Sequence, residues 1–358
     1  MTTFVGSVRI VGAGLLGTSI GLALTKQGVD VSIASRSTKS VELATNYGAG
    51  RAATDTDSPN LIVVCVPPDQ TAEIVAQELR IFPQAFVTDV ASVKQSILHS
   101  LETMGAPIER YVGSHPMAGR ERGGALAGRA DLFLGRPWIV CAHSKSLPAA
   151  TKAVKDLASS LESSVVELSA KDHDRAVALV SHLPQLVASL LAGRLIESDS
   201  KDVALAGQGL RDTTRIASSD PDLWMQIFSA NADQVSLALN AFAADLKEAS
   251  AALNDLSKTE NQATLRQVLS LGNTGVEKIP GKHGAKHSIY SQVVVMINDE
   301  PGQLAKLLTD VGEIGINLEE LKLEHSPSAQ IGLVELYIAP AKEQKLITEL
   351  ELRNWRLV

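Results

Sequence analysis

The residues of this sequence best suited to chemistry are a histidine and a serine that each follow a strand-like run. His115 lies in the segment SHPMAGRERGG, and Ser92 follows the run AFVTDVA. Both would lie at the carboxyl edge of a parallel sheet, where ligands bind in open α/β folds. Histidine titrates near neutrality, so His115 could remove a proton from a substrate hydroxyl as hydride leaves the same carbon. The alternative is that His115 only forms hydrogen bonds within its loop.

Three glycines form a second motif with a physical meaning. Gly12, Gly14 and Gly17 give the spacing G-x-G-x-x-G after the run VRIV and before a helical pattern. Here Gly12 allows a tight turn, Gly14 lets the backbone approach a pyrophosphate, and Gly17 lets helix and strand pack closely. The amides of Leu15 and Leu16 would face the phosphates at the positive end of the helix. The motif therefore predicts a dinucleotide site, and the alternative is a glycine-rich turn without a ligand.

The residues after the second strand bear on which dinucleotide binds. An NAD site commonly has an acidic residue there for the ribose 2′-hydroxyl. This sequence has Ser35, Arg36 and Ser37 instead, and an arginine with two hydroxyls can bind a 2′-phosphate. We therefore expect a preference for NADP, unless Arg36 only stacks on adenine in a site that accepts NAD as well. Val66, after the run LIVVC, is a further expected cofactor contact.

Polar residues in the middle of the chain could bind a substrate. Arg215 follows a glycine-flanked helical stretch, and arginine binds carboxylates through paired hydrogen bonds, although position alone does not exclude a surface ion pair. His173 and His182 are nine residues apart, which places them on nearly opposite faces of a regular helix. We therefore expect at most one of these histidines to contact a substrate. For either, a structural role in the core is the alternative.

The elements that must position these residues are arranged along the chain in distinct blocks. Short β-branched runs alternate with helical patterns over residues 1–169, which predicts βαβ units with a mainly parallel, Rossmann-type sheet. Residues 170–272 change to Ala/Leu-rich helical periodicity, and Ser169 with Asp172 fits a capping box. Residues 273–288 are rich in Gly, Lys and His and indicate a linker.

The last part of the chain, residues 289–358, has the order strand, helix, strand, strand, helix, strand. That β-α-β-β-α-β order is the ferredoxin-like arrangement. With 358 residues, of which 45% are hydrophobic, the chain is long enough for two or three domains with substantial cores. We therefore expect an α/β Rossmann-type domain, an all-α domain and a ferredoxin-like domain in series.

Composition and charge narrow the range of partners. The net charge is −7, basic residues do not gather on any segment, and aromatics are only 4%, so nucleic acid is not expected as a partner. Cys65 and Cys141 lie in apolar runs, and no Cys/His spacing resembles a zinc site, so we expect no metal and a reduced, cytoplasmic location. No basic leader and no apolar run near ~18–20 residues is evident, so no membrane segment is expected.

Five motifs together resemble one family. The segments VGAGLLGTSIG, TDVASVK, SHPMAGRERGG, HDRAVALVSHLPQ and GLRDTTRIASSDPDLW are similar, in this order, to those of the prephenate/arogenate dehydrogenases of tyrosine biosynthesis. The likeness covers essentially the whole chain. The tail, with INDEPGQLAKLLTDVGEIGINLEEL, resembles an ACT domain, the small effector-binding module of many amino-acid pathway enzymes.

The resemblance implies an oxidative decarboxylation. Hydride would pass from C4 of prephenate to NAD(P)+, the 4-hydroxyl would lose its proton, and carbon dioxide would leave as the ring becomes aromatic, giving 4-hydroxyphenylpyruvate. His115 matches the family's catalytic histidine that takes this proton, and Ser92 matches the serine near the hydroxyl and the nicotinamide. The expected substrate contacts are Arg215 at the carboxylate, Glu121 at the pocket mouth, and His182, Gln185, Ser219 and Trp224.

Two departures from the family pattern leave the choice between prephenate and arogenate as substrate undecided. Many members have histidine where this chain has Gln185, and a small polar residue where it has Arg120. Both positions would face the substrate side chain, which is a keto acid in prephenate and an amino acid in arogenate. The extra arginine favours the more anionic prephenate, and arogenate is the alternative. A more distant alternative is a regulator that senses NADP(H) and has lost the chemistry.

The resemblance also implies control and assembly. In ACT domains the turns at either end of the first helix line an amino-acid site, and here these turns contain Asp299, Pro301, Gly302, Gly315 and Asn317. We expect feedback inhibition by tyrosine, and the alternative is a module that only dimerises or stabilises the chain. The Ala/Leu-rich helices of residues 170–272 predict a homodimer interface.

Overall fold

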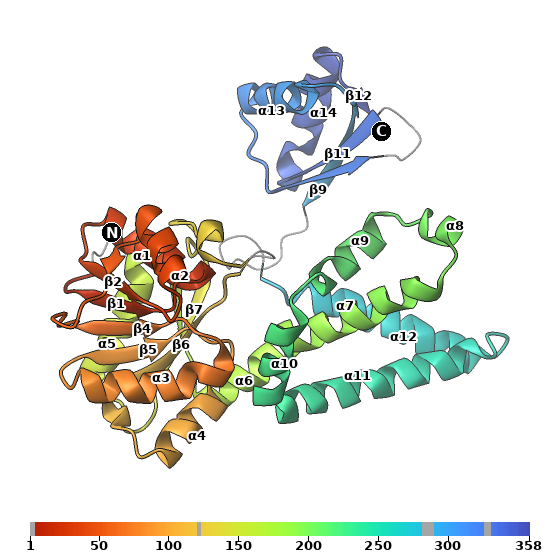
Figure 1. Ribbon diagram of the computed structural model, residues 1–358. Helices are drawn as coiled ribbons and strands as arrows, with labels where there is room; N and C mark the ends of the chain where they lie inside the picture. Colours follow the sequence, from red (N-terminus) through yellow and green to blue (C-terminus); the bar gives the residue numbers. More distant parts are fainter. Residues whose placement is uncertain (1–3, 120–122, 281–289, 326–330) are drawn as a thin grey trace. The chain divides into compact units, whose positions relative to one another are not determined.

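The computed structural model describes residues 4–119, 123–280, 290–325 and 331–358. The chain divides into two compact units, Met1–Ala244 and Asp245–Val358. The division falls inside one long helix, α11 (Ala232–Leu253), which is drawn with the other elements in Figure 1.

The first unit contains a sheet in the order β3-β2-β1-β4-β5-β6-β7-β8. Every neighbouring pair is parallel except β6 and β7, which are antiparallel, so the predicted mainly parallel sheet is confirmed. The sequence patterns did not indicate β3, which is only two residues long. The strands are β1 (Val8–Val11), β2 (Val31–Ala34), β3 (Arg51–Ala52), β4 (Leu61–Val64), β5 (Phe86–Asp89), β6 (Tyr111–Pro116), β7 (Pro137–Cys141) and β8 (Ser164–Glu167).

Helices cover both faces of this sheet, as Figure 1 shows for α1 and α2 on one side and α3 and α4 on the other. Successive strand side chains point to opposite faces, so Ile62 and Val63 of β4 belong to different hydrophobic clusters. Val63 packs with α1, α2 and α5, and Ile62 packs with α3 and α4. The helices are α1 (Leu15–Lys26), α2 (Thr38–Asn46), α3 (Pro68–Ile81), α4 (Gln95–Thr103) and α5 (Pro148–Ser160).

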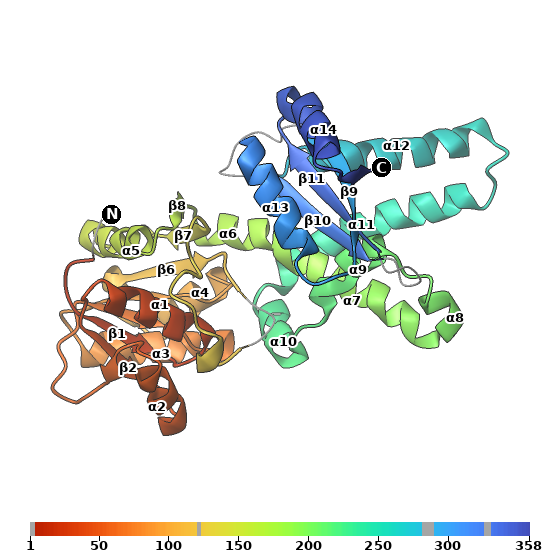
Figure 2. The same ribbon diagram turned by 90° about the horizontal axis from the view of Figure 1, so that it is seen from above.

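The rest of the first unit is helical and begins at α6 (Ala170–Val177). The Ser169 hydroxyl accepts a hydrogen bond from the backbone N–H of Asp172 at 3.0 Å, which confirms the predicted cap. Figure 2 shows α6 leading away from β8 toward α7. A π-helical turn, Ala178–His182, joins α6 to α7. The other helices are α7 (Leu183–Gly193), α8 (Ser200–Val203), α9 (Gln208–Thr214) and α10 (Pro221–Ala230).

One helical stretch, Ala170–Glu197, is long and apolar enough to cross a membrane by length and composition, because one 18-residue window within it has a mean hydropathy of 1.6. No apolar run of this length was expected from the sequence, and this window is the exception to that expectation by mean hydropathy. Only 28% of this window is buried, and this is the one such stretch among the described residues.

The second unit contains α12 (Thr259–Val276) and a small antiparallel sheet. Because α12 continues to Val276, residues 273–276 of the predicted linker are helical rather than irregular. Residues 281–288 of the predicted linker lie outside the described residues.

The sheet of the second unit has the order β10-β11-β9-β12, with antiparallel pairing throughout. The helices α13 and α14 cover one face, where Leu307 and Leu350 belong to the same cluster as Val295 and Leu336 (Figure 1). The predicted β-α-β-β-α-β order is confirmed. Its elements are β9 (Ser291–Asn298), α13 (Gln303–Ile314), β10 (Glu320–His325), β11 (Ile331–Ile338), α14 (Glu343–Leu352) and β12 (Arg356–Leu357).

Candidate active site

The turn between β1 and α1 has the geometry that a dinucleotide requires. Gly12 has a φ of +115°, and a Cβ there would lie 2.3 Å from the carbonyl oxygen of Cys65. A Cβ on Gly17 would lie 2.0 Å from the carbonyl oxygen of Gly12. At Gly14 no atom lies within 4 Å of such a Cβ, and no side chain caps the helix that starts there. The first-turn amides of α1 therefore have open space beside them, which a pyrophosphate fits.

The segment between β2 and α2 lies at the same edge of the sheet and carries no acidic side chain at residues 35–37. Ser35 is half-buried and Arg36 is exposed. The hydroxyl of Ser37 accepts a hydrogen bond from the backbone N–H of Ser40 at 3.2 Å, so it caps α2. Val66 is half-buried just after β4. Residues 35–37 therefore contain an arginine and two hydroxyl groups, and no carboxylate.

His115, near the end of β6, begins a chain of three hydrogen-bonding groups. Its Nδ1 lies 2.9 Å from Nε2 of His173, and Nδ1 of His173 lies 2.7 Å from Oδ1 of Asp174. The carboxylate of Asp174 also accepts from the backbone N–H groups of Lys94 and Gln95, each at 2.8 Å. These two amides are at the start of α4, where the helix dipole favours a negative charge. Asp174 is therefore held in place as a carboxylate.

The surroundings keep both histidines of this chain uncharged. Burial lowers the pKa of His115 well below its usual value, and the neighbouring His173 and Lys94 lower it further. Burial also lowers the pKa of His173. Lys94 is itself buried in an ion pair with Asp89, which accepts a hydrogen bond from the Tyr111 hydroxyl at 2.6 Å. A neutral imidazole can accept a proton, so His115 has the protonation state of a general base at neutral pH.

His182 belongs to the same network as His173. Asn231 donates from Nδ2 to the backbone carbonyl of Asp174 at 2.8 Å, and the same nitrogen lies 3.2 Å from Nδ1 of His182. The His182 ring packs edge-to-face with Trp224, with centroids 5.9 Å apart, and burial lowers its pKa to about 4. The spacing of nine residues predicted nearly opposite faces for the two histidines. A regular α-helix was assumed, whereas the π-helical turn between them has wider turns and changes their angular relation.

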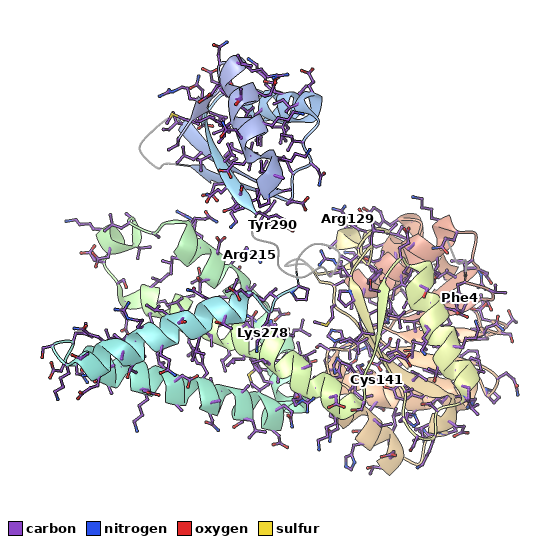
Figure 3. All side chains as sticks on the ribbon, turned by 180° about the vertical axis from the view of Figure 1, so that it is seen from behind. Phe4, Arg129, Cys141, Arg215, Lys278 and Tyr290 are labelled. Atoms are coloured by element: carbon purple, nitrogen blue, oxygen red, sulfur yellow. The ribbon has the colours of Figure 1, made fainter. Side chains whose placement is uncertain are left out.

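The other expected substrate contacts come from three segments. The Ser219 hydroxyl lies 3.4 Å from Oε1 of Gln185, a buried residue of α7. Arg215, labelled in Figure 3, is exposed and starts a 3-10 turn (Arg215–Ala217) that packs against α7. Ser92 is half-buried in the loop between β5 and α4. Glu121 lies outside the described residues.

Sequence reasoning missed Asp174, Asn231 and the buried pair of Asp89 and Lys94. A local signal existed for two of these four residues, because Asp174 directly follows a histidine and Lys94 lies two residues after Ser92. Asn231 gave no such signal, since its two partners are 57 and 49 residues away in the chain.

In the second unit, the residues expected to bind an effector lie on two exposed turns. Asp299, Pro301 and Gly302 lie between β9 and α13, and Gly315 and Asn317 lie between α13 and β10. Both glycines have positive φ, +90° for the first and +74° for the second, so each turn has a backbone conformation that favours glycine.

Comparison with known proteins places these features in a family. Residues 20–167 match the family model described as the nucleotide-binding domain of prephenate dehydrogenase, and residues 169–270 match its dimerization domain. A Streptomyces niveus protein named probable prephenate dehydrogenase NovF is 33% identical over 97% of this chain and 98% of its own length. The prephenate dehydrogenase of Bacillus subtilis is 24% identical over 88% of each chain.

Solved structures agree with these sequence matches. The crystal structure of Aquifex aeolicus prephenate dehydrogenase with hydroxyphenyl propionate and NAD+ matches 75% of this chain and 98% of that one, with a TM-score of 0.68 and 28% identity. The structure of Synechocystis arogenate dehydrogenase, at 24% identity and a TM-score of 0.63, has the same fold over 75% of this chain. This chain therefore belongs to the prephenate dehydrogenase family of NAD(P)-dependent oxidoreductases.

Proposed function

We propose that this chain converts prephenate to 4-hydroxyphenylpyruvate and carbon dioxide, with His115 as the base that takes the proton of the 4-hydroxyl. The observation that carries the proposal is the chain of contacts from His115 through His173 to Asp174. It lies at the carboxyl edge of the sheet, on the same edge as the turn between β1 and α1.

The proton positions along this chain follow from its last member. A carboxylate only accepts, so Nδ1 of His173 carries a proton and donates to Asp174. In a neutral His173 the other nitrogen then accepts, and Nδ1 of His115 must be its donor. The remaining nitrogen of His115, Nε2, therefore has the lone pair and can take the substrate proton. The negative charge of Asp174 stabilises the imidazolium that forms.

Residues of the first unit fit a nicotinamide dinucleotide. The open side of Gly14 and the amides of Leu15 and Leu16 would hold the pyrophosphate. When bound, the nicotinamide ring supplies the acceptor for the hydride that leaves C4 of the substrate. The protein then has only to align the substrate carbon and to remove the hydroxyl proton, because aromatisation of the ring drives the loss of carbon dioxide.

Between NADP and NAD, the preferred cofactor is proposed to be NADP. Support comes from Arg36 and Ser35 at the end of β2 and from the lack of any carboxylate at residues 35–37 that would repel a 2′-phosphate. Values of kcat/KM with NADP+ and NAD+ test this preference, and a higher value with NAD+ would overturn it.

Prephenate is proposed over arogenate as the substrate. Arg215 would bind the ring carboxylate, and Ser219 with Gln185 would lie beside the side chain. Arg120, which carries the argument for the more anionic substrate, lies outside the described residues, as does Glu121. Steady-state assays of prephenate and arogenate, each with both cofactors, test the activity and the substrate together. Turnover of neither would favour the non-catalytic NADP(H)-sensing alternative.

The second unit is proposed to contain an ACT-type regulatory domain that binds tyrosine. Its β-α-β-β-α-β order supports this. Asn317 and the turn at Pro301 would hold the amino and carboxylate groups. Calorimetric titration with tyrosine tests the proposal, and an absence of binding would leave a structural module.

We further propose a homodimer in the cytoplasm. The match of residues 169–270 to a dimerization domain supports the assembly. The two cysteines, Cys65 and Cys141, are both free thiols, as in a reducing compartment.

A further inference from the structure

We propose that Asn231 is a positioning residue that holds His182 as its neutral Nε2–H tautomer, so that His182 offers a fixed hydrogen-bond donor to an oxygen atom of the substrate. The inference rests on the proposed function in one respect, namely that His182 lines the substrate pocket. It adds which ring nitrogen carries the proton, which residue decides this, and which kind of substrate atom the ring can bind.

The orientation of the Asn231 amide is fixed by its stronger contact. The backbone carbonyl of Asp174 can only accept, so the Asn231 atom 2.8 Å from it is the NH2 nitrogen and not the oxygen. Asn231 is only 5% exposed, so the amide has little room to turn. The second hydrogen of this NH2 group is available for Nδ1 of His182, which lies 3.2 Å from the same nitrogen.

This contact determines where the His182 proton lies. Because the Asn231 nitrogen donates, Nδ1 of His182 must accept with its lone pair, and the proton of a neutral ring is then on Nε2. The titratable groups near the ring are Asp174 and His173 from α6 and His115 from β6. Burial outweighs the attraction of Asp174, so the ring remains neutral at physiological pH.

The Nε2–H group is buried and unsatisfied. His182 has no exposed surface, and Nε2 has no hydrogen-bond partner among the described residues. The ring's aromatic neighbour is Trp224, whose indole has no oxygen that could accept a hydrogen bond. A buried N–H group without an acceptor destabilises the protein. A ligand oxygen that accepts a hydrogen bond from it therefore removes this cost as well as forming the bond, which strengthens ligand binding. A carboxylate or carbonyl oxygen fits this donor, and an ammonium group, which only donates, does not.

One residue thus gives two histidines opposite roles. The carboxylate of Asp174, acting through His173, leaves His115 with a lone pair for a substrate proton. The backbone carbonyl of Asp174, acting through Asn231, leaves His182 with a proton for a substrate oxygen. The pocket therefore presents one acceptor and one donor, and each is fixed before substrate binds.

The first experiment reads the tautomer directly in the full-length wild-type protein. Nitrogen-15 NMR of the histidine rings at pH 7 is expected to show the Nε2–H form for His182, with the signals assigned by their loss in His182→Gln. An Nδ1–H form or an imidazolium would overturn the proposal. This readout does not require turnover, so it remains valid if the enzyme acts on neither prephenate nor arogenate, a result that would instead contradict the proposed function.

The second experiment separates positioning from simple stability. Asn231→Leu removes the donor, and we expect KM for prephenate to rise roughly 10- to 100-fold while kcat changes less than about threefold. Asn231→Asp replaces the donor with an acceptor and raises the pKa of the ring. KM should then be near the wild-type value at acidic pH, where the imidazolium still donates from Nε2, and should rise as the ring loses its proton.

Asn240→Asp is the matched control, because it makes the same change at an exposed position of α11. Its KM should stay equal to that of the wild type at every pH. Thermal melting checks that each variant is folded. A KM unchanged in Asn231→Leu, or a KM in Asn231→Asp that does not depend on pH, would overturn the proposal.

Discussion

At the scale of single residues, the protons of the buried histidines are set by the groups that they contact. His115 and His173 are arranged by a carboxylate that can only accept, and their low pKa values keep them neutral. In the proposed mechanism, the charge of Asp174 supports His115 as the base through His173, although Asp174 and His115 are not in direct contact. Two substitutions separate the base from the group that orients it.

Replacing the base itself should have the larger effect on chemistry. His115→Asn keeps a polar side chain and removes the nitrogen that accepts the substrate proton. We expect kcat to fall by roughly 10²–10⁴, because this is the usual contribution of a positioned general base. The affinity for the dinucleotide, measured by fluorescence titration, should be unchanged. A kcat close to that of the wild type would show that another group takes the proton.

Replacing Asp174 tests the orienting chain. Asp174→Asn puts an NH2 group among the N–H donors of His173, Lys94 and Gln95, so His173 is no longer held as a donor to residue 174. We expect kcat to fall by roughly 10²-fold or more and KM to change less. Asp172→Asn, two residues earlier and paired with Arg175 at the surface, is the control and should keep full activity. Equal activity of the two variants would contradict the orienting role.

The sequence could reveal His115 but not the groups that set its proton. His115 and Ser92 follow strands, and the carboxyl edge of a parallel sheet is a general location for ligands. Asp174 contacts the backbone of Lys94 across 80 residues, and such a contact depends on how α6 packs against α4. A pattern of residue types contains no information about that packing, so the network emerges only in three dimensions.

At the scale of elements, the turn between β1 and α1 was predictable because its geometry is local. Gly12 and Gly17 are needed for reasons that involve only the strand, the turn and the helix, and the spacing G-x-G-x-x-G records them. The π-helical turn before α7 was not predictable in this way. Its residues ALVSH are compatible with an ordinary α-helix, so the periodicity gave no sign of the wider turn between His173 and His182.

Gly14 and Gly17 should respond differently to a methyl group. Gly14→Ala places a Cβ in open space, so the fold should be unaffected, but the methyl would occupy room that the pyrophosphate needs. We expect KM for the dinucleotide to rise at least about tenfold with no change in melting temperature. Gly17→Ala is the comparison, because its Cβ would lie 2.0 Å from a backbone oxygen and should destabilise the protein. A Gly14→Ala variant with normal cofactor KM would argue against a dinucleotide at this turn.

At the scale of the whole molecule, the number of domains expected from length and pattern differs from the division in the structure. The sequence indicates three blocks because its composition changes near residues 169 and 288. The structure divides once, inside α11, because the α/β part and the helices from α6 to α10 form one compact unit. The network of half-buried His115 and buried His173 and His182 joins these two parts of the first unit.

That network makes stability depend on pH. Each of the three histidines has a lower pKa in the folded protein than in the unfolded chain, so the unfolded chain binds more protons below pH ~6.5. The contribution of these neutral histidines to the free energy of unfolding should therefore be complete above pH ~6.5 and decrease on acidification. For His182, with its pKa lowered to about 4, the loss is roughly 3 kcal/mol by pH 4.

Urea unfolding between pH 7.5 and 4.5 measures this dependence. The slope of the free energy of unfolding against pH should decrease in His182→Gln, which removes one of the three histidines. It should be unchanged in His99→Gln, which removes an exposed histidine. A stability that is constant over this range, or that rises on acidification, would contradict the assignment of neutral, buried imidazoles.

The helical part of the first unit exposes more apolar surface than a monomer needs. Leu179, Val180, Leu190, Ile196 and Leu237 are each between 59% and 86% exposed, and surfaces of this kind commonly mark an interface. We expect wild-type protein to have twice the 37.9 kDa mass of one chain in light scattering. Leu190→Asp puts a charge on α7 and should shift the mass toward that of one chain, since burying an unpaired charge is unfavourable.

The control for this variant is Ile81→Asp, which puts the same charge on an apolar residue of α3 that is also more than half exposed. Because α3 belongs to the nucleotide-binding part, the mass of this variant should stay that of two chains. If both variants keep the dimer mass, the interface lies elsewhere on the molecule. If both variants become monomers, the loss of the dimer is not specific to α7. Leu190→Asp would then give no support for an interface at these helices.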